Sequence, residues 1–472
     1  MVFSSSIFIF VFLPISLIGY YLLDRKYRNI FLLLMSLAFY AWGEPKFIVI
    51  LLGSIFLNYV YALLVDRYRD NKLIARLILT LMVLSNLAIF FVFKYLNFAV
   101  TNVNRLLSTE FAVPNIALPI GISFFTFQAM SYVFDVYRKN GDVQKNPLNV
   151  ALYIAFFPQL VAGPIVRYET VAREINSRKE TFADFSAGMS RFIIGLGKKV
   201  IIANSVAMVA DRAYRITPFT DLSVGYAWLG SICYTLQILF DFSGYSDMAI
   251  GLGRMFGFHF MENFNYPYTA KSITDFWRRW HISLSTWFRD YVYIPLGGSR
   301  VSKAKTYRNI FVVWLLTGVW HGASWNYVAW GMFYFVLLIF EKQFGFPDRI
   351  RSAWGKVVYR LLTFLAVNFG WVLFRANGLK GAIHYVLCMF GLHGNPLSDP
   401  KLWITFKDSL VTLILAGILC FPVVGWLEAK AEKSRYDKAF EIVRGVCLLL
   451  LFAVSISYCL NGSYNPFIYF NF

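Results

Sequence analysis

Two histidines occupy sequence surroundings in which an ionisable side chain is either costly or well placed to act on a substrate. His321 lies near the middle of an uncharged run from Asn309 to Phe340. An ionisable residue at that depth of an apolar segment usually faces a cavity or a partner, so function is the default hypothesis. A neutral imidazole, with an ordinary pKa of about 6.5, suits proton transfer. We predict a catalytic His321, with structural hydrogen bonding to another helix as the alternative.

The second histidine, His281, lies in a segment rich in tryptophan and arginine, Phe276 to Ser285. This composition is typical of a cytoplasmic membrane interface, where a histidine costs little. Alone, His281 would be a polar loop residue, but Arg278 and Arg279 stand close before it. Guanidinium groups bind phosphates well, so the pair is a candidate site for a phosphate-bearing ligand. The alternative is that both arginines hold the segment to lipid headgroups.

A third group of polar residues, Asp241 to Asp247, directly follows the apolar run 222–240. Ser243 and Asp247 are four residues apart and share one face of a helix. A hydrolase triad is disfavoured because G-x-S-x-G is absent. We interpret the group as a helix end that positions other parts, and one of the aspartates, Asp241 or Asp247, is a candidate to orient a histidine.

The composition describes the scaffold that must position these residues. Of 472 residues, 58% are hydrophobic, 19% aromatic and only 15% charged, whereas a soluble domain has about 25% charged residues. This excludes a soluble globule and a disordered chain. The net charge of +19 comes from basic residues in short loops, which favours an anionic membrane surface over nucleic acid. The class that remains is an all-α polytopic membrane protein.

Apolar runs of sufficient length predict the membrane spans. A spanning helix needs about 20 apolar residues, and we expect about eleven full spans with some re-entrant pieces in one membrane domain, 1–472. The first run is expected to be a retained helix with its N-terminus outside. The candidate ranges are 3–23, 30–43, 46–65, 77–99, 116–137, 147–166, 186–210, 222–240, 309–340, 356–374, 381–392, 405–427 and 443–460.

Three segments interrupt this regularity. The stretch 156–165 contains two prolines and a glycine between basic flanks, which predicts a re-entrant hairpin, with a kinked span as the alternative. The amphipathic segment 271–308 is expected at the cytoplasmic interface. Glu428 to Arg444 is expected to form a solvated loop. The five cysteines stand singly and H-E-x-x-H is absent, so we predict no metal site.

Two long motifs resemble the membrane-bound O-acyltransferase family. They are Asp275 to Gly298, which reads DFWRRWHISLSTWFRDYVYIPLGG, and Trp320-His321-Gly322 in a long apolar helix. The PLGGSR ending, the segment Asp241 to Asp247 and the 158–164 stretch are similar to the bacterial alginate O-acetyltransferase branch. The resemblance covers nearly the whole chain and is most specific within the core motifs at 241–331.

This resemblance implies a ring of transmembrane helices around a central tunnel, with His321 catalytic and His281 supporting or catalytic. It implies acetyl transfer from a cytoplasmic thioester donor such as acetyl-CoA, with no bound cofactor, to an extracytoplasmic polysaccharide. The implied location is the bacterial inner membrane, and the implied partner is a periplasmic transferase of the SGNH-hydrolase type. Arg278 and Arg279 would hold the donor phosphates, and Trp320, Asn326 or a backbone N–H would stabilise the oxyanion.

Several alternatives remain at this stage. Within the family, the acceptor is peptidoglycan or another exopolysaccharide such as cellulose, or the reaction is D-alanyl transfer to teichoic acid. Outside it, the chain is a polysaccharide or lipid transporter without chemistry of its own. A transporter predicts an intramembrane charge pathway and repeat symmetry, and neither is evident in the sequence.

Overall fold

The computed structural model describes residues 1–431, 437–461 and 464–466, and these residues form helices and connections without a β-strand. The chain divides into two compact units. The first unit contains Met1–Phe192 and Tyr245–Met261, and the second contains Ile193–Gly244 and Glu262–Phe472. Two long helices, α10 (Phe182–Gly197) and α12 (Val224–Met255), begin in one unit and end in the other.

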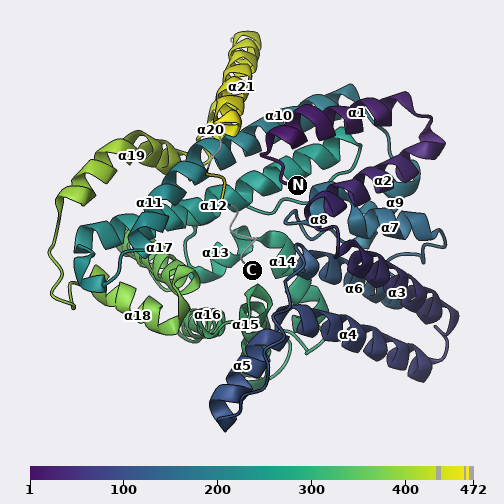
Figure 1. The fold of residues 1–472 in the computed structure, drawn as a ribbon, viewed down its shortest axis with the longest axis horizontal. Coiled ribbons are helices and arrows are strands. Elements are labelled where there is room, and N and C mark those ends of the chain that lie inside the picture. Colours follow the sequence, from purple (N-terminus) through teal and green to yellow (C-terminus); the bar gives the residue numbers. More distant parts are fainter. Residues whose placement is uncertain (432–436, 462–463, 467–472) are drawn as a thin grey trace. The chain divides into compact units, whose positions relative to one another are not determined.

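The first unit is built on a group of helices around α3 (Ile48–Arg67). This helix packs against α4 (Lys72–Lys94), α6 (Ile122–Arg138) and α7 (Pro147–Ala155), as Figure 1 shows. The buried amides of Asn58 and Asn86 exchange two hydrogen bonds of 3.0 Å between α3 and α4. Side-chain amides of this kind join apolar helices through hydrogen bonds. The remaining helices of this unit are α1 (Leu13–Leu22), α2 (Arg25–Gly43), α5 (Leu96–Leu107), α8 (Phe157–Leu160) and α9 (Tyr168–Ser177).

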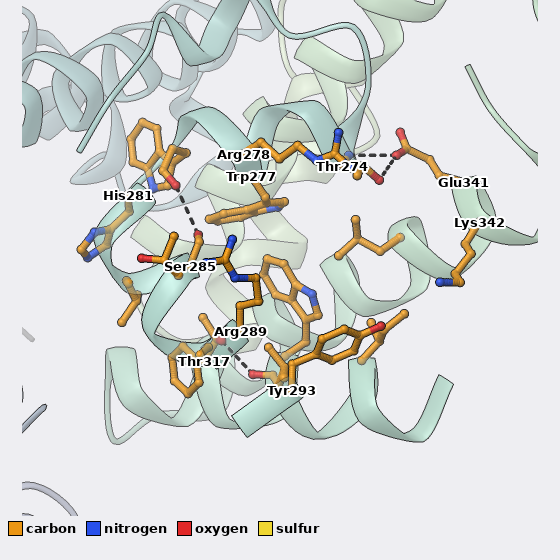
Figure 2. A pocket seen from close by; sticks show the side chains of 18 of the residues that line it. Thr274, Trp277, Arg278, His281, Ser285, Arg289, Tyr293, Thr317, Glu341 and Lys342 are labelled. Atoms are coloured by element: carbon orange, nitrogen blue, oxygen red, sulfur yellow. Dashed lines mark hydrogen bonds between the residues drawn. The ribbon is translucent and has the colours of Figure 1, made fainter. Parts of the chain in front are cut away.

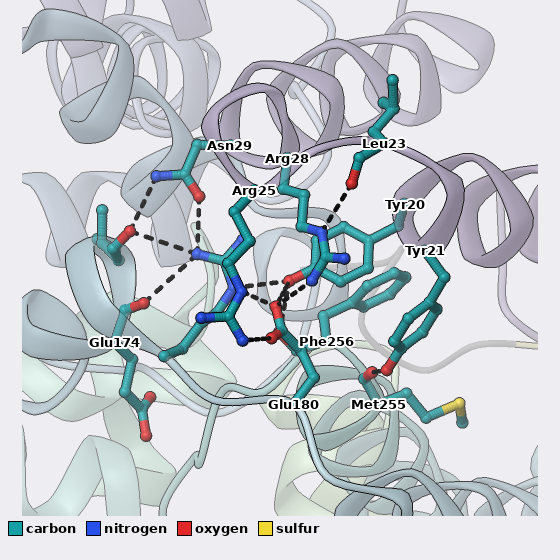
Figure 3. Close-up of polar contacts among 12 residues, drawn as sticks. Tyr20, Tyr21, Leu23, Arg25, Arg28, Asn29, Glu174, Glu180, Met255 and Phe256 are labelled. Carbon is teal, nitrogen blue, oxygen red and sulfur yellow. Dashed lines mark hydrogen bonds and ion pairs between the residues drawn. The ribbon is translucent and has the colours of Figure 1, made fainter.

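A charged cluster around Glu180 fixes the ends of α1 and α2 within the first unit (Figure 3). Tyr20 donates a hydrogen bond of 2.5 Å to Glu180, and Arg28 pairs with the same carboxylate at 3.0 Å. Arg178 donates from Nε to the Tyr20 hydroxyl at 2.8 Å. Burial alone would raise the pKa of Glu180, but the bonds from Tyr20 and Arg28 outweigh burial and hold that pKa below its usual value. The carboxylate is therefore charged and joins three segments of the chain.

The second unit contains both motif regions. Its central feature is the helix pair α15 (Lys303–His321) and α16 (Trp325–Phe344). A Cβ on Gly331 would overlap the backbone carbonyl of Trp314, so glycine lets the two helices touch through their backbones. The short helices α13 (Ile273–Arg279) and α14 (Ile282–Phe288) precede the π-helical turn η5 (Arg289–Tyr293), and α13 packs against α16. The other helices are α11 (Asn204–Tyr214), α17 (Ala353–Arg375), α18 (Gly378–Met389), α19 (Pro400–Leu419), α20 (Val423–Ala431) and α21 (Asp437–Leu460).

The helices have the apolar character of a multi-pass membrane protein. Within the described ranges, six segments are long and apolar enough to cross a bilayer. The predicted total of about eleven spans, and their arrangement as a ring around a tunnel, stay predictions. The six segments are Ile48–Arg67, Lys72–Lys94, Phe182–Tyr214, Ala353–Arg375, Pro400–Leu419 and Lys438–Leu460.

Three expectations about helix boundaries are wrong. The run 309–340 is two helices, because the chain becomes extended at Gly322 and helical again from Trp325. Asp241 to Asp247 lie inside α12 and not at a helix end, since this helix of 32 residues extends from Val224 to Met255. Glu428 to Arg444 is largely helical in α20 and α21, and its residues 432–436 lie outside the described residues.

The proline-rich stretch 156–165 does interrupt the helix, as its composition predicts. α7 ends at Ala155, α8 covers only Phe157–Leu160, and the chain then continues without helix to α9. Pro158 stands at the start of α8, where its missing N–H costs nothing. A re-entrant path through a membrane stays a prediction.

Candidate active site

His321 is the last residue of α15, so its side chain lies at a helix end and not in a helix interior. Gly322 has an extended backbone with φ −179° and ψ 160°, which stops the helix directly after the histidine. A Cβ on Gly322 would overlap the ring of Tyr327, so the chain reverses closely into α16 at this point. His321 is buried, with 5% of its surface exposed. The helix break therefore places a buried imidazole where the backbone changes direction.

His281 links α13 to α14 in a conformation that is rare for a residue with a side chain. Its φ of 44° and ψ of 55° are in the left-handed region. Non-glycine residues in sparsely populated regions store about 1–3 kcal/mol and gather at functional sites. Only 1% of its surface is exposed, so the imidazole is enclosed by protein, whereas the cytoplasmic interface stays a prediction for this segment. Burial lowers the pKa of His281 to about 3, which keeps this imidazole neutral near pH 7.

Asn263 fixes the loop that carries His281. The amide oxygen of Asn263 lies 3.1 Å from Nδ1 of His281 and accepts hydrogen bonds from Ser283, from its backbone N–H at 3.2 Å and its hydroxyl at 2.9 Å. An amide oxygen requires a donor, so the first contact places the imidazole proton on Nδ1. The other ring nitrogen, Nε2, is then the basic one.

Both histidines line one cavity of about 860 Å³ within the second unit. Figure 2 shows this cavity from close by, with His281 at one side and Glu341 and Lys342 at the other. Its lining combines apolar and aromatic walls with many polar and charged groups, which can orient a small-molecule ligand. The polar and charged side chains of the lining are Thr274, Arg278, His281, Ser285, Thr286, Arg289, Tyr293, Thr317, His321, Glu341, Lys342 and Asp348.

Aromatic rings surround the two imidazoles. The ring of Trp320 lies 6.1 Å from that of His281 and 5.0 Å from that of His321. His321 also meets Trp330 at 4.9 Å and Phe374 at 5.1 Å, each close to edge-on. These rings limit rotation of the His321 side chain and exclude water around it, which strengthens electrostatic interactions there.

The two arginines predicted to bind phosphate are in different positions. Arg278 lines the cavity. Arg279 pairs with Asp275 on its own helix, with Nε 3.0 Å from Oδ1. The structure thus brings Arg278 together with the two histidines and engages Arg279 in a local ion pair.

The four predicted supporting residues also lie in different surroundings. Asp241 forms a buried ion pair with Lys199, with Nζ 2.7 Å from Oδ1. Asp247 belongs to the first unit and pairs with Arg191 at 2.8 Å. Asn326 directs its Nδ2 to the backbone oxygens of Leu373 and Ala376, at 3.3 and 3.4 Å. Trp320 packs against both histidines.

Glu341 is a site residue that sequence reasoning missed. Its side chain lines the cavity and 3% of the residue is exposed. The carboxylate accepts hydrogen bonds from the N–H of Ile273 at 2.6 Å and the hydroxyl of Tyr359 at 2.9 Å, besides two from Thr274. A carboxylate ending an apolar run of more than thirty residues was the available signal. Asn263 carried no comparable signal.

The described part of the chain contains no group of three or more His, Cys, Asp or Glu side chains placed to hold a metal ion. The chemistry available in the cavity is that of imidazole, guanidinium, ammonium, hydroxyl and carboxylate groups. Two imidazoles in an enclosed space suit proton transfer during attack on a carbonyl group.

Comparison with known proteins shows the family to which this chain belongs. The model of the membrane-bound O-acyltransferase family matches residues 123–381. A probable alginate O-acetylase of Azotobacter vinelandii is 41% identical over the whole length of both chains. A peptidoglycan O-acetyltransferase of Helicobacter pylori is 33% identical over all of this chain and 98% of its own.

A more distant relative matches in part. A teichoic acid D-alanyltransferase of Bacillus subtilis is 32% identical over 54% of this chain and 68% of its own. The region matched by the family model contains both cavity histidines. The chain is therefore a multi-pass membrane acyltransferase and belongs to the membrane-bound O-acyltransferase family.

Proposed function

We propose that this acyltransferase takes acetyl from a cytoplasmic thioester, acetyl-CoA, and passes it across the inner membrane for O-acetylation of an extracytoplasmic polysaccharide, with alginate as the first candidate. The observation that carries the proposal is the shared cavity of His281 and His321. The full-length similarity to a probable alginate O-acetylase favours acetyl as the group and alginate as the final acceptor.

In the proposed reaction, His321 acts as general base. Its imidazole takes the proton of an acceptor hydroxyl while the hydroxyl oxygen attacks the acetyl carbonyl carbon. The C–S bond of the tetrahedral intermediate then breaks, the thiol leaves, and the imidazolium returns the proton to sulfur. An acetyl-histidine intermediate is the alternative route. His281, neutral and fixed by Asn263, contacts the same Trp320 side chain as His321 and supports the reaction from there.

The developing oxyanion requires a donor at the carbonyl oxygen. The Asn326 amide directs Nδ2 to backbone oxygens at 3.3–3.5 Å. The indole N–H of Trp320 and the backbone N–H groups at the α15–α16 turn are therefore the better candidates. A periplasmic transferase of the SGNH-hydrolase type is the proposed carrier of acetyl to the polysaccharide.

Peptidoglycan is the second candidate acceptor. The peptidoglycan O-acetyltransferase of Helicobacter pylori matches the entire chain, whereas the teichoic acid D-alanyltransferase matches about half of it. This difference in coverage favours acetyl transfer over D-alanyl transfer.

The experiment that tests the proposal compares acetyl content of secreted polysaccharide and of peptidoglycan in cells that carry wild type, His321→Ala or His281→Ala at matched membrane levels. We expect His321→Ala to lower acetyl at least about a hundredfold, the usual contribution of a general base. His384→Ala is the control, because His384 is an exposed residue that contacts His393 at 3.1 Å outside the cavity lining. Unchanged acetyl with His321→Ala would contradict the catalytic assignment, and loss from peptidoglycan alone would select the second acceptor.

A further inference from the structure

A side arm of the first unit turns its polar groups inward and its large apolar side chains outward. The arm consists of α5 (Leu96–Leu107) and the irregular chain that returns beside it, and we call residues 96–116 the α5 arm. It continues from the end of α4, its chief helical neighbour, as Figure 1 shows, and every residue of α5 is at least partly exposed. The arm contains two charged residues, Arg105 and Glu110. It is therefore an exposed structure with a nearly uncharged sequence.

Two asparagines of α5 join the returning chain through their side-chain amides. Asn104 donates from Nδ2 to the backbone oxygen of Phe111 at 2.7 Å and accepts from the backbone N–H of the same residue at 2.9 Å. Asn97, seven residues earlier on α5, donates to the oxygen of Ile116 at 3.1 Å and accepts from its N–H at 3.2 Å. Each amide thus satisfies both backbone groups of one residue in the irregular chain.

The other uncharged polar side chains of α5 are also engaged within the arm. Thr101 and Asn102 donate to backbone oxygens one turn earlier, at 2.8 and 2.7 Å. Thr109, after the end of the helix, donates to the side-chain oxygen of Asn104 at 3.0 Å. Irregular backbone is tolerated in apolar surroundings where its polar groups are satisfied within the protein. The two asparagine contacts give the α5 arm this property.

The outer side of the α5 arm is apolar. Leu106, Leu107 and Phe111 are 82%, 63% and 60% exposed, and they lie at and just after the far end of α5. Val103 and Val113 are exposed as well. Large apolar side chains that are exposed close together mark an interaction surface. Because the amides are turned inward, this surface offers apolar contact and little hydrogen bonding.

The end of α4 indicates which surroundings this surface meets. α4 is one of the six segments long and apolar enough to cross a bilayer. Its exposed side chains Leu84, Leu87 and Phe91 share one face, at spacings of three and four residues. The helix ends at Lys94, and Tyr95 directly after it stacks on Phe91 with ring centroids 6.5 Å apart. Lysine and tyrosine at the end of a span are typical of the level of the lipid headgroups. α5 therefore begins where the lipid-facing surface of α4 ends.

We propose that the α5 arm lies in the bilayer surface at this end of α4, with Leu106, Leu107 and Phe111 inserted among the lipid chains. An amphipathic helix of this kind binds a lipid surface through the apolar area that it buries there. Arg105 and Glu110, both exposed, stay at the level of headgroups and water, as the charged side of an interfacial helix does. The arm is thus a lipid-binding anchor of the first unit.

The test measures the surroundings of a spin label attached to the arm. The full chain carries Cys447→Ser and Cys459→Ser, which remove the exposed and the partly exposed thiol. It is labelled singly at Leu106→Cys or Phe111→Cys and placed in nanodiscs of phosphatidylcholine and phosphatidylglycerol. Accessibility of the label to O₂, which concentrates in lipid, is compared with its accessibility to a water-soluble nickel chelate. We expect O₂ to be the more effective reagent at both positions.

Two further labels calibrate this measurement. Leu84→Cys, on the exposed face of α4, reports lipid, and Asp142→Cys, in an exposed loop of the same unit, reports water. We expect the ratio of O₂ to nickel accessibility at both arm labels to match that of Leu84→Cys. A match to Asp142→Cys at either arm position would overturn the proposal.

Charge placed on the outer side gives an independent measurement. Carboxylates are costly among lipid chains, so we expect Leu106→Glu/Leu107→Glu to shift a label at Phe111→Cys toward nickel accessibility. Leu106→Met/Leu107→Met is the matched control, since it keeps the size and apolar character of both side chains, and it should leave the label in lipid. The same label environment in the two variants would overturn the proposal.

A partner protein is the competing occupant of this surface. The same labels are therefore measured both in native membranes and in nanodiscs of the purified chain. If both reagents fail to reach them in native membranes, while in nanodiscs they match Asp142→Cys, a protein covers the arm and the proposal is wrong. A lipid-like ratio in both preparations supports insertion into the bilayer.

Discussion

The carboxylate of Glu341 on α16 accepts two hydrogen bonds from Thr274 on α13, from its backbone N–H at 2.8 Å and its hydroxyl at 2.6 Å. This contact fixes the start of the short helix that carries Arg278 and leads into His281. The geometry of the active-site cavity therefore depends on a charged group at the far end of α16, some distance along the chain from either motif.

Replacement of Glu341 by Gln tests this dependence. Gln keeps the shape but presents an N–H₂ group where the carboxylate accepts, so at least one buried donor loses its partner at a cost of about 1–3 kcal/mol. We expect acetyl transfer per folded molecule to fall about tenfold or more. Tyr359→Phe removes the bond of 2.9 Å without touching α13 and should cost much less. Equal losses in the two variants would show that Glu341 acts through overall stability.

Asn263→Ala should release the imidazole of His281 from its fixed orientation. The change removes the oxygen that accepts from Ser283 and faces Nδ1 of His281, so the imidazole loses its fixed tautomer. We expect kcat to fall about tenfold or more while KM for the donor changes little. Asn265→Ala, an exposed neighbour, is the control. A change confined to KM would instead point to donor binding.

The depressed pKa of His281 predicts an acid-sensitive fold. The unfolded histidine takes up its proton near pH 6.5, whereas burial delays protonation in the folded protein to about pH 3. Between these values the unfolded state binds more protons, so stability falls as the pH is lowered below 6.5. Thermal unfolding in detergent at pH 5 and pH 7 measures the effect. In His281→Asn, which tolerates the left-handed backbone, the pH dependence should shrink. If the stability of wild type and of His281→Asn depends equally on pH, other titrating groups cause the dependence.

The buried pair of Lys199 and Asp241 should matter for folding and not for chemistry. Their side chains are 3% and 1% exposed at a separation of 2.7 Å. Lys199→Met leaves a buried carboxylate without its cation and should lower the stability of the fold by about 3–5 kcal/mol. The loss is measured as a lower amount of the protein in the membrane. The double change Lys199→Met/Asp241→Leu should restore much of the level. If the double variant reaches the wild-type amount in the membrane but transfers no acetyl, Asp241 also acts in the active site.

Composition alone was sufficient for the broad class, because no soluble core could cover so much apolar surface. The helical ends were harder to predict. The uniform hydropathy of the run around His321 gives no sign that the helix ends there. Gly322 was the available signal for that helix end. Asp241 to Asp247 looked terminal because polar residues follow an apolar run, but burial against partners such as Lys199 lets the helix continue.

Tertiary contacts explain the remaining differences. His281 stands among arginines and tryptophans, a composition typical of an interface, yet it is buried because neighbouring segments cover it, including Phe242 at 4.7 Å. Glu341 accepts a hydrogen bond from Thr274, which lies 67 residues away, and Asn263 accepts one from Ser283, 20 residues away. Contacts over such separations leave no periodic trace in a single sequence.

The left-handed backbone at His281 has a consequence for laboratory evolution of this protein. Asparagine also accommodates such a backbone and, unlike glycine, keeps a polar side chain at this buried position, so selection for heat resistance alone should accept asparagine at position 281. Selection for product formation should hold the imidazole there. Sequencing position 281 after the two regimes would therefore reveal whether its histidine is retained for architecture or for turnover, without a single purified enzyme.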